Sequence, residues 1–254
     1  MTDKLVIAVE RALTQATLGI SKLDKPIFFL NGMSSPKVRH FLNNLCEHPD
    51  TRYLEVGSWR GSTIISALYD NHLTVSEVIC IDDFSEFHNP HAEDGSVYNA
   101  NPLIKMLDPE SQRFFLPAVP PKQELMEKSD YFLKARPSRF DFYVVMWFSQ
   151  SILNQLRTRP LSTRINTYFY DGGHDRESQY KAFTEYDFIL DHQFIAMVDD
   201  WNAIGVKDGT FEAFAALGYR VIRQWELPSN GNGDIYNWWN GLYVAVIEKS
   251  VSAS

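Results

Sequence analysis

The sequence is poor in cysteine, in basic residues and in long apolar runs, and each scarcity excludes a class of protein. The cysteines are Cys46 and Cys80, and both lie in apolar sequence, which indicates reduced, buried thiols in a cytoplasmic protein and argues against a disulfide framework. The formal net charge is −8, so we expect no nucleic-acid partner, because such binding needs a basic face to displace counterions. No apolar run approaches the roughly 18 residues of a membrane span, and the first residues lack the pattern of a signal peptide, so no membrane partner is expected either.

The rest of the composition is ordinary for a globular protein, with 44% apolar and 22% charged residues. The length of 254 residues suits one α/β domain, and no internal repeat or low-complexity linker divides residues 1–254. Residues 3–21 place apolar side chains at helical spacing, and Ser34-Ser35-Pro36 is typical of a helix start. We therefore expect residues 1–50 to form a helical cover over one side of the core or over a partner subunit.

An apolar strand, a tight loop and a helix organise the rest of the chain. Residues 53–56 indicate a strand that carries Glu55 and breaks at Gly57, and a helix begins after Gly61. Glycines at the carboxyl end of a parallel strand let a ligand approach the backbone closely. The spacing E-x-G-x-x-x-G lacks the middle glycine that seats a pyrophosphate, which argues against a nicotinamide-dependent enzyme. A tight turn without a ligand is the alternative.

The remaining apolar segments predict further strands and helices in alternation. Strands are expected at residues 78–83, 140–146, 167–171 and 194–201, and helices at 150–157, 177–190 and 208–217. Two late strands, at residues 219–225 and 242–247, resemble a hairpin at the edge of the sheet.

Residues 84–138 interrupt this alternation, apart from a short helical pattern near residues 123–133. More than fifty residues is too long for a usual connection, so we expect an insertion that serves as a lid or as an oligomer contact. It contains four side chains that a metal could use, but no repeated ligand spacing supports a metal site there. These residues are His88, His91, Glu93 and Asp94.

Acidic residues fall near the ends of several of the expected strands. In an open parallel sheet these ends share one crevice, with neighbouring strands about 4.8 Å apart. Asp82, at the tip of the second strand, is placed to accept hydrogen bonds from a ribose diol, although it or Asp83 is also suited to cap the next helix.

Asp171, Asp199 and Asp200 come from the fourth and fifth strands, whose carboxylates would approach one another. Like charges at that range repel by several kcal/mol unless one is protonated or a cation lies between them. Carboxylate oxygens with room for water suit Mg²⁺, so we expect these three residues to hold that ion. Helix capping, or pairing with Arg176 or Lys207, is the alternative.

His174 lies three residues beyond Asp171, on the loop above the same crevice. A histidine at that place is able to take a proton at neutral pH from a hydroxyl whose acidity a metal has raised. A loop histidine by itself is more often an ordinary surface residue.

With these residues in view, the chain resembles a class I S-adenosylmethionine-dependent methyltransferase, and within that class the branch of the macrocin and mycinamicin sugar O-methyltransferases. The resemblance covers roughly residues 34–83 and 167–249. It depends on the segment from Glu55 to Thr63, on Asp82, on Asp171-Gly172-Gly173-His174 and on Asp199-Asp200.

The resemblance implies a Rossmann-like, doubly wound α/β sheet of seven strands, mostly parallel with an antiparallel last strand, and with helices on both faces. It implies that S-adenosylmethionine lies over the first loop with its ribose against Asp82. It also implies that Asp171, Asp199 and Asp200 bind Mg²⁺ and that His174 acts as the base. The candidate contacts of the donor in the loop are Glu55, Gly57, Ser58, Trp59, Gly61 and Ser62.

The sequence departs from this pattern in two motifs, and most of residues 84–138 match no part of it, which leaves the acceptor open. Related enzymes carry Glu-Asp where this chain has Asp199-Asp200, so its first acid reaches less far. The segment Met146-Trp147-Phe148-Ser149 lacks the acid or small polar pair that often lies beside the adenine.

The leading hypothesis is methyl transfer to a hydroxyl of a small-molecule acceptor such as a sugar, with S-adenosylmethionine as donor and Mg²⁺ as a second cofactor. One alternative is a methyltransferase that acts on another nucleophile or without a metal. Another is a catalytically silent binding protein that keeps the fold. Its contact surfaces would be residues 84–138 and the aromatic segment Tyr236-Asn237-Trp238-Trp239.

Overall fold

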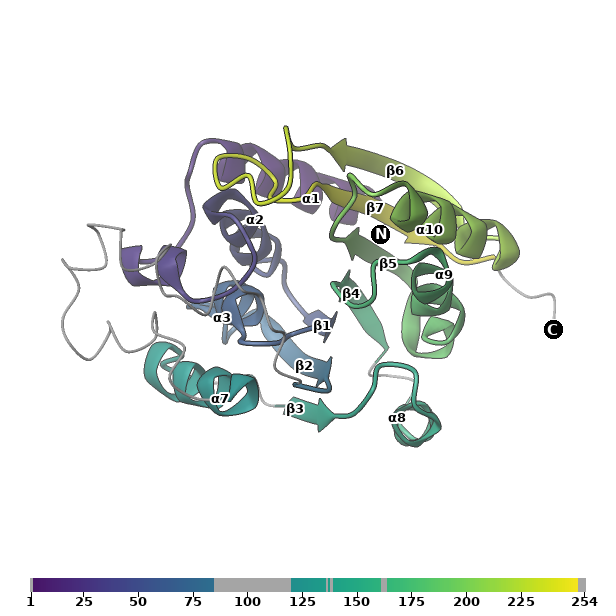
Figure 1. Ribbon diagram of the computed structural model, residues 1–254, viewed down its shortest axis with the longest axis horizontal. Coiled ribbons are helices and arrows are strands. Elements are labelled where there is room, and N and C mark those ends of the chain that lie inside the picture. The colour runs from purple at the N-terminus through teal and green to yellow at the C-terminus, as the bar shows by residue number, and fades with distance from the viewer. Residues whose placement is uncertain (1, 85–119, 136, 138, 161–163, 251–254) are drawn as a thin grey trace.

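The computed structural model describes residues 2–84, 120–135, 137, 139–160 and 164–250. Within these residues one sheet of seven strands runs in the order β3-β2-β1-β4-β5-β7-β6 (Figure 1). The strands are β1 (Thr51–Val56), β2 (Val75–Asp82), β3 (Arg139–Val144), β4 (Ile165–Tyr170), β5 (Leu190–Val198), β6 (Arg220–Leu227) and β7 (Leu242–Glu248).

Strands β1 to β5 pair in parallel, whereas β7 is antiparallel to both of its neighbours, β5 and β6. The chain switches direction between β1 and β4, because β2 and β3 extend the sheet to one side of β1 and the later strands extend it to the other. The predicted doubly wound, mostly parallel sheet with an antiparallel last strand is confirmed, and so is the late antiparallel pair at its edge.

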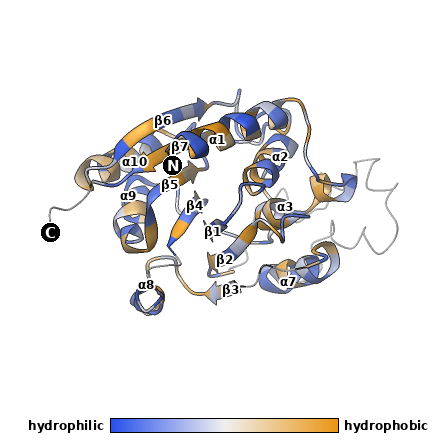
Figure 2. Ribbon diagram, turned by 180° about the vertical axis from the view of Figure 1, so that it is seen from behind, coloured by the Kyte–Doolittle hydropathy of each residue, from blue (hydrophilic) through white to orange (hydrophobic). Residues whose placement is uncertain are grey.

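Helices cover both faces of the sheet (Figures 1 and 2). They are α1 (Thr2–Thr17), η1 (Lys25–Phe29), α2 (Pro36–Leu45), α3 (Ser62–Leu68), α7 (Pro121–Phe132), α8 (Gln150–Arg157), α9 (Arg176–Thr184), η5 (Asp187–Ile189) and α10 (Ile204–Ala216). Helices α1, α2, α3 and α7 contribute to one buried cluster, and α8, α9 and α10 contribute to the other. No described helix combines the length and the apolar character needed to cross a bilayer.

The central strands are buried on both faces because successive side chains point to opposite clusters. On β1, Tyr53 joins the cluster under α2 while Leu54 joins the cluster under α8 and α9. On β4, Phe169 and Tyr168 divide in the same way. This alternation explains why these strands read in the sequence as continuous apolar runs.

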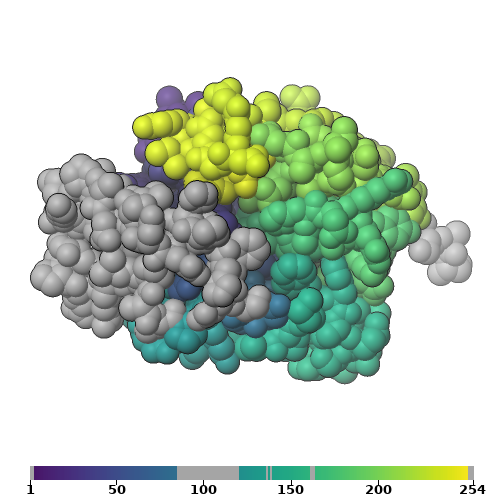
Figure 3. Space-filling view, viewed as in Figure 1, coloured from purple at the N-terminus to yellow at the C-terminus, as the bar shows by residue number. Residues whose placement is uncertain are grey.

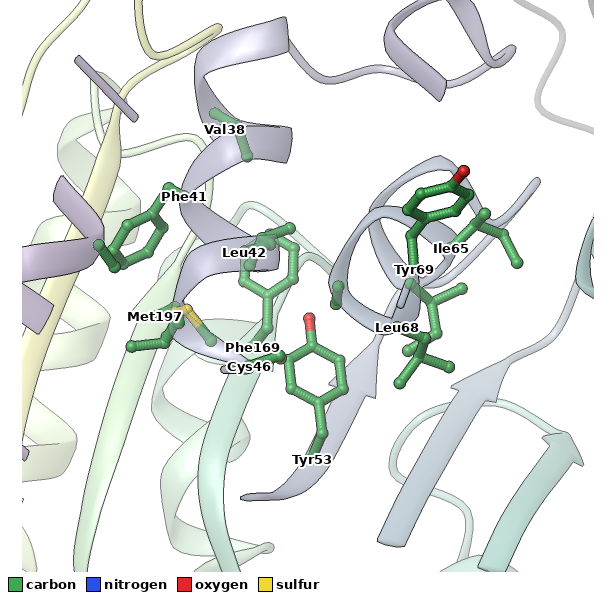
Figure 4. Close-up of a cluster of buried hydrophobic side chains, with 14 of the residues drawn as sticks. Val38, Phe41, Leu42, Cys46, Tyr53, Ile65, Leu68, Tyr69, Phe169 and Met197 are labelled. Atoms are coloured by element: carbon green, nitrogen blue, oxygen red, sulfur yellow. The ribbon is translucent and has the colours of Figure 1, made fainter. Parts of the chain in front are cut away.

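Helix α2 delivers the chain to β1, as its sequence predicts. The hydroxyl of Ser35 accepts a hydrogen bond from the backbone N–H of Val38 at 3.2 Å, with Pro36 in the first turn. Phe41 and Leu42 then lie toward the sheet, close to Phe169 in the cluster that Figure 4 shows.

One helix is shorter than expected. The predicted helix over residues 177–190 ends at Thr184, and the chain passes through η5 before β5 begins at Leu190. The apolar spacing misled the prediction because Ile189 and Leu190 are buried by the turn and the strand instead of by a helix face. Lys249 holds this turn, since its ammonium donates to the carbonyl of Leu190 at 2.8 Å.

The insertion predicted at residues 84–138 is described in part. Its expected helix near residues 123–133 is confirmed as α7, which packs beside α3. The segment with His88, His91, Glu93 and Asp94 lies outside the described residues, and the role of the insertion as a lid or oligomer contact stays a prediction.

Two glycines of α10 give a test of how closely α9 and α10 pack. A Cβ at Gly209 would lie 2.2 Å from the carbonyl oxygen of Arg176, whereas a Cβ at Gly205 would lie 3.5 Å from the nearest atom, the nitrogen of Arg176. Alanine in a helix is normally favoured over glycine by about 1 kcal/mol. We predict that Gly209→Ala instead lowers the free energy of unfolding by about 2 kcal/mol, because the backbone of α9 at Arg176 must move away from the new methyl group.

Urea unfolding of both variants measures this difference, with Gly205→Ala as the matched control that should be neutral or slightly stabilising. Equal stability of the two variants would contradict the close helix contact.

Candidate functional site

A cavity of about 400 Å³ opens at the carboxyl ends of the central strands. This volume lies within the range of small-molecule sites, and its place beside the switch between β1 and β4 is where open α/β sheets bind ligands. It is lined by Met33, Gly57, Ser58, Trp59, Arg60, Ser62, Thr63, Asp82, Asp83, Trp147, Asp171, Gly172, His174, Asp199, Asp200, Asn232, Trp239 and Asn240. Figure 3 shows the C-terminal part of the chain, in yellow, beside the green part that precedes it in the sequence, on one face of the molecule.

The loop after β1 has no room for a side chain at Gly57. Its φ is +93°, and a Cβ would lie 1.9 Å from the carbonyl oxygen of Asp171. The ends of β1 and β4 are therefore in backbone contact, and the N–H of Asp171 donates to Val56 at 2.8 Å. Gly61, with φ +80°, closes the loop by donating to the carbonyl of Ser58 at 2.7 Å. The predicted tight loop is confirmed.

Asp82 faces the cavity and holds the same loop. One carboxylate oxygen accepts from the backbone N–H of Trp59 at 2.9 Å, and the other accepts from Phe84 at 2.5 Å. The residue is 5% exposed, and burial raises its pKa while the two backbone bonds oppose that rise. Each oxygen keeps a lone pair, so the carboxylate can also accept from a ligand hydroxyl.

Glu55 lies behind the loop and does not line the cavity. Its two oxygens accept from the hydroxyls of Tyr53, at 2.8 Å, and Thr63, at 2.9 Å. The side chain is fully buried, and burial raises the pKa of Glu55 to about 7 against the hydrogen bonds that lower it. The structure therefore assigns Glu55 to the support of the loop. Of the other predicted donor contacts, Gly57, Ser58, Trp59, Ser62 and Asp82 line the cavity, whereas Gly61 does not and instead faces Leu125 of α7.

The acids after β4 and β5 meet as expected. The carboxyl groups of Asp171 and Asp199 are buried next to each other, so each influences the pKa of the other. Burial, followed by the neighbouring carboxylates, raises the pKa of Asp171 well above its ordinary range and also raises that of Asp199. Like charges crowded in this way bind protons or a cation more readily than isolated acids do.

His174 lies in the same group, on the loop between β4 and α9. Its Nδ1 is 2.8 Å from a carboxylate oxygen of Asp200, and this hydrogen bond raises the pKa of His174. The other oxygen of Asp200 accepts from the amide of Asn240 at 2.6 Å. A carboxylate on Nδ1 selects the tautomer in which Nε2 carries the free lone pair. Within the described residues, one ligand atom each of Asp171, His174 and Asp200 lies within 4.8 Å of the others.

Some lining residues were not predicted as site residues. Met33 precedes α2, and Asn232, Trp239 and Asn240 come from the connection between β6 and β7. The aromatic segment at residues 236–239 was assigned only to a contact surface. Its neighbour Asn240 carries no sequence signal, because its contact with Asp200 joins residues forty positions apart.

Among known proteins, similarity to this chain is found in the folds of solved structures. No protein-family model matches the chain, and neither does any curated protein. Solved structures that resemble it include the O-methyltransferase TomG from Streptomyces achromogenes, in complex with SAM, at 16% identity and TM-score 0.48, covering 94% of this chain and 90% of that one. Another is precorrin 8W decarboxylase from Methanobacterium thermoautotrophicum, at 14% identity and TM-score 0.46, covering 87% and 94%.

A third similar structure is a Streptococcus mutans protein assigned as a SAM-dependent methyltransferase, at 13% identity and TM-score 0.49. The match covers 84% of this chain and 48% of that protein, so this chain spans about half of its length. At such identities and TM-scores, these likenesses assign neither a substrate nor an activity to this chain.

The titration of Glu55 makes the free energy of unfolding depend on pH. Its pKa is about 7 when folded, against 4.5 for the ordinary carboxyl, so between these values the folded protein keeps a proton that the unfolded chain has released. Stability therefore falls as the pH rises through this range, by about 3 kcal/mol in total, and stays at the lower level above it. We predict that Glu55→Gln removes this component.

Urea unfolding at about pH 5 and about pH 8 tests the prediction. The exposed Glu177→Gln on α9 is the matched control and should keep the wild-type pH dependence. If Glu55→Gln keeps it as well, Glu55 does not titrate as stated.

Proposed function

We propose that this chain is an S-adenosylmethionine-dependent O-methyltransferase that acts, with Mg²⁺, on a hydroxyl of a sugar or another small molecule. The observation that carries the proposal is the shared cavity: the glycine loop after β1, Asp82 at the end of β2 and the group of Asp171, His174 and Asp200 all border one space. A donor site and a proton-accepting site must lie this close for a methyl group to pass directly between two bound molecules.

The donor is proposed to lie along the loop after β1. Gly57 and Ser58 line the cavity, and the positive φ of Gly57 turns the loop there, so that the amino-acid part of the donor can approach its backbone. The Asp82 carboxylate, already held by two backbone N–H groups, is oriented to accept the ribose hydroxyls. In this arrangement Glu55 acts on the loop from behind and not on the donor.

The residues after β4 and β5 fit a hard cation. Asp171, Asp199 and Asp200 offer carboxylate oxygens, the ligands that Mg²⁺ prefers. Burial, followed by the neighbouring carboxylates, raises the pKa of Asp171 and Asp199, and a cation would compensate the charge of those neighbours. A bound Mg²⁺ would supply Lewis acidity that favours the alkoxide of the acceptor. Ligand atoms of Asp171 and Asp200 lie within 4.8 Å of each other, and Asp199 adjoins Asp171, so we assign the cation to these three residues together.

His174 is the proposed base. Asp200 holds the Nδ1 side of the imidazole, so Nε2 is the nitrogen that accepts the proton of the acceptor hydroxyl. As that O–H bond breaks, the acceptor oxygen forms a bond to the methyl carbon and the bond from that carbon to the donor sulfur breaks. The products are a methyl ether and a neutral thioether, and the proton remains on His174, where the Asp200 carboxylate stabilises the imidazolium.

Donor binding is the first test of the function. Calorimetric titration with S-adenosylmethionine should give one site, and Asp82→Asn should weaken binding about tenfold or more, because a charged hydrogen-bond acceptor is lost. Asp208→Asn, an exposed change on α10, is the control and should bind as the wild type does. A wild-type protein that does not bind the donor would overturn the proposal in favour of another role for the fold.

The roles of His174 and Mg²⁺ are tested by measuring methyl transfer and donor affinity separately. With methyl-labelled donor and a panel of glycosides and small polyols, His174→Ala should lower methyl transfer about a hundredfold or more, since a general base contributes at least that much. Donor affinity should change little. A chelator should likewise lower transfer and leave donor affinity intact.

The exposed His192→Ala is the matched control for His174→Ala. Equal turnover in His174→Ala would remove this residue from the mechanism, and undiminished transfer in chelator would reject Mg²⁺.

A further inference from the structure

Helix α7 carries a lysine whose ammonium group is completely enclosed. Lys128 is 0% exposed, and its Nζ donates to the carbonyl oxygens of Asn31 and Arg60, both at 2.9 Å. It also forms an ion pair with Glu124, one turn earlier on the helix, at 2.7 Å. An ammonium has three N–H donors, so these three acceptors use all of them.

The two carbonyls that Lys128 binds belong to segments that wall the cavity. Arg60 lies inside the loop after β1, between Trp59 and Gly61, and itself lines the cavity. Asn31 lies two residues before Met33, which lines the cavity from the side of α2. Lys128 is thus a bridge between α7 and two loops that are distant in sequence.

The backbone of these segments is packed too closely to tolerate much movement. A Cβ at Gly61 would lie 2.8 Å from Cγ of Leu125 on α7, and a Cβ at Gly32 would lie 2.0 Å from the hydroxyl of Ser62. The guanidinium of Arg60 pairs with the second oxygen of Glu124, so α7 holds this residue by both its side chain and its carbonyl.

The contribution of the Lys128–Glu124 ion pair to folding stability does not by itself explain why a lysine lies at this position. Burying an ammonium is costly, and apolar residues of similar volume often replace a buried ion pair without loss of stability. The polar contacts of Lys128 with two carbonyls, in contrast, have no apolar substitute, because they specify where those carbonyls lie.

We propose that Lys128 is a positioning residue for the methyl donor, which it serves by fixing the carbonyls of Arg60 and Asn31 and so the shape of the loop after β1. This inference rests on the proposed function, because it takes S-adenosylmethionine as the ligand of that loop. A loop that is held in its binding shape before the ligand arrives spares the ligand the cost of ordering it. Loss of the two contacts therefore weakens donor binding, although Lys128 itself does not line the cavity.

The competing explanation is that Lys128 only neutralises Glu124, and a double-mutant cycle distinguishes the two. The variants are Lys128→Met, Glu124→Gln and the double variant, in which no uncompensated carboxylate is left beside the methionine. For each we measure the urea midpoint, the affinity for S-adenosylmethionine, and hydrogen exchange of the peptide that contains residues 57–63.

We expect Lys128→Met to lose stability and the double variant to recover most of it. Both should bind the donor about tenfold more weakly or worse than the wild type does, and both should show faster exchange at residues 57–63, since neither holds the Arg60 carbonyl. Lys134→Met, which removes a largely exposed ion pair with Asp70, is the matched control and should change neither donor affinity nor exchange.

If the double variant recovers donor affinity and slow exchange as well as stability, Lys128 is not a positioning residue for the donor. If Lys128→Met fails to fold, the charge-balanced double variant still decides the question. A wild-type protein that does not bind the donor would overturn the proposed function instead, and unchanged exchange in the double variant would then overturn the positioning role separately.

Discussion

The backbone contact between Gly57 and Asp171 is the constraint on which the site depends. With no Cβ at Gly57, the loop after β1 lies directly against the carbonyl of Asp171, at a distance that any side chain would prevent. The contact brings the proposed donor loop and the acid group of β4 to one cavity. A glycine at this position is therefore required by packing as well as by its positive φ.

Holding three acids and a histidine at one end of the sheet opposes folding, because like charges repel and burial removes their hydration. The protein reduces this repulsion locally. The raised pKa of Asp171 and of Asp199 favours their neutral forms, and the Asp200 carboxylate accepts from His174 and Asn240. The two apolar clusters on either face of the sheet supply the compensating stability. The acids are thus tolerated where they lie because the rest of the sheet is buried on both sides.

The sequence predicts those features that depend on local pattern. Apolar runs identify the strands, and glycine spacing identifies the loop after β1. Acids at the end of a strand, such as Asp82, or just beyond it, such as Asp171, identify the edge of the sheet where the cavity lies. It does not predict contacts made by side chains from distant segments. Lys128 reads as one more charged residue on a polar helix, and nothing in the sequence indicates that its ammonium reaches Asn31 and Arg60. The early end of α9 was missed for a related reason, since burial by a turn and burial by a helix face have the same apolar spacing.

The loop after β1 and the first turn of α3 are held at three different atoms by three residues outside the loop. Asp82 accepts from the N–H of Trp59, Lys128 donates to the carbonyl of Arg60, and Glu55 accepts from the hydroxyl of Thr63 at the start of α3. Because each contact restrains a separate atom, the loop is ordered without a ligand, and a ligand that meets it gains its binding energy without ordering the backbone first. The three charged residues also differ in exposure to the cavity: Asp82 lines it, whereas Glu55 and Lys128 do not. Only Asp82 is therefore able to exchange part of its hydrogen bonding with a ligand, while the other two keep the loop in place during that exchange.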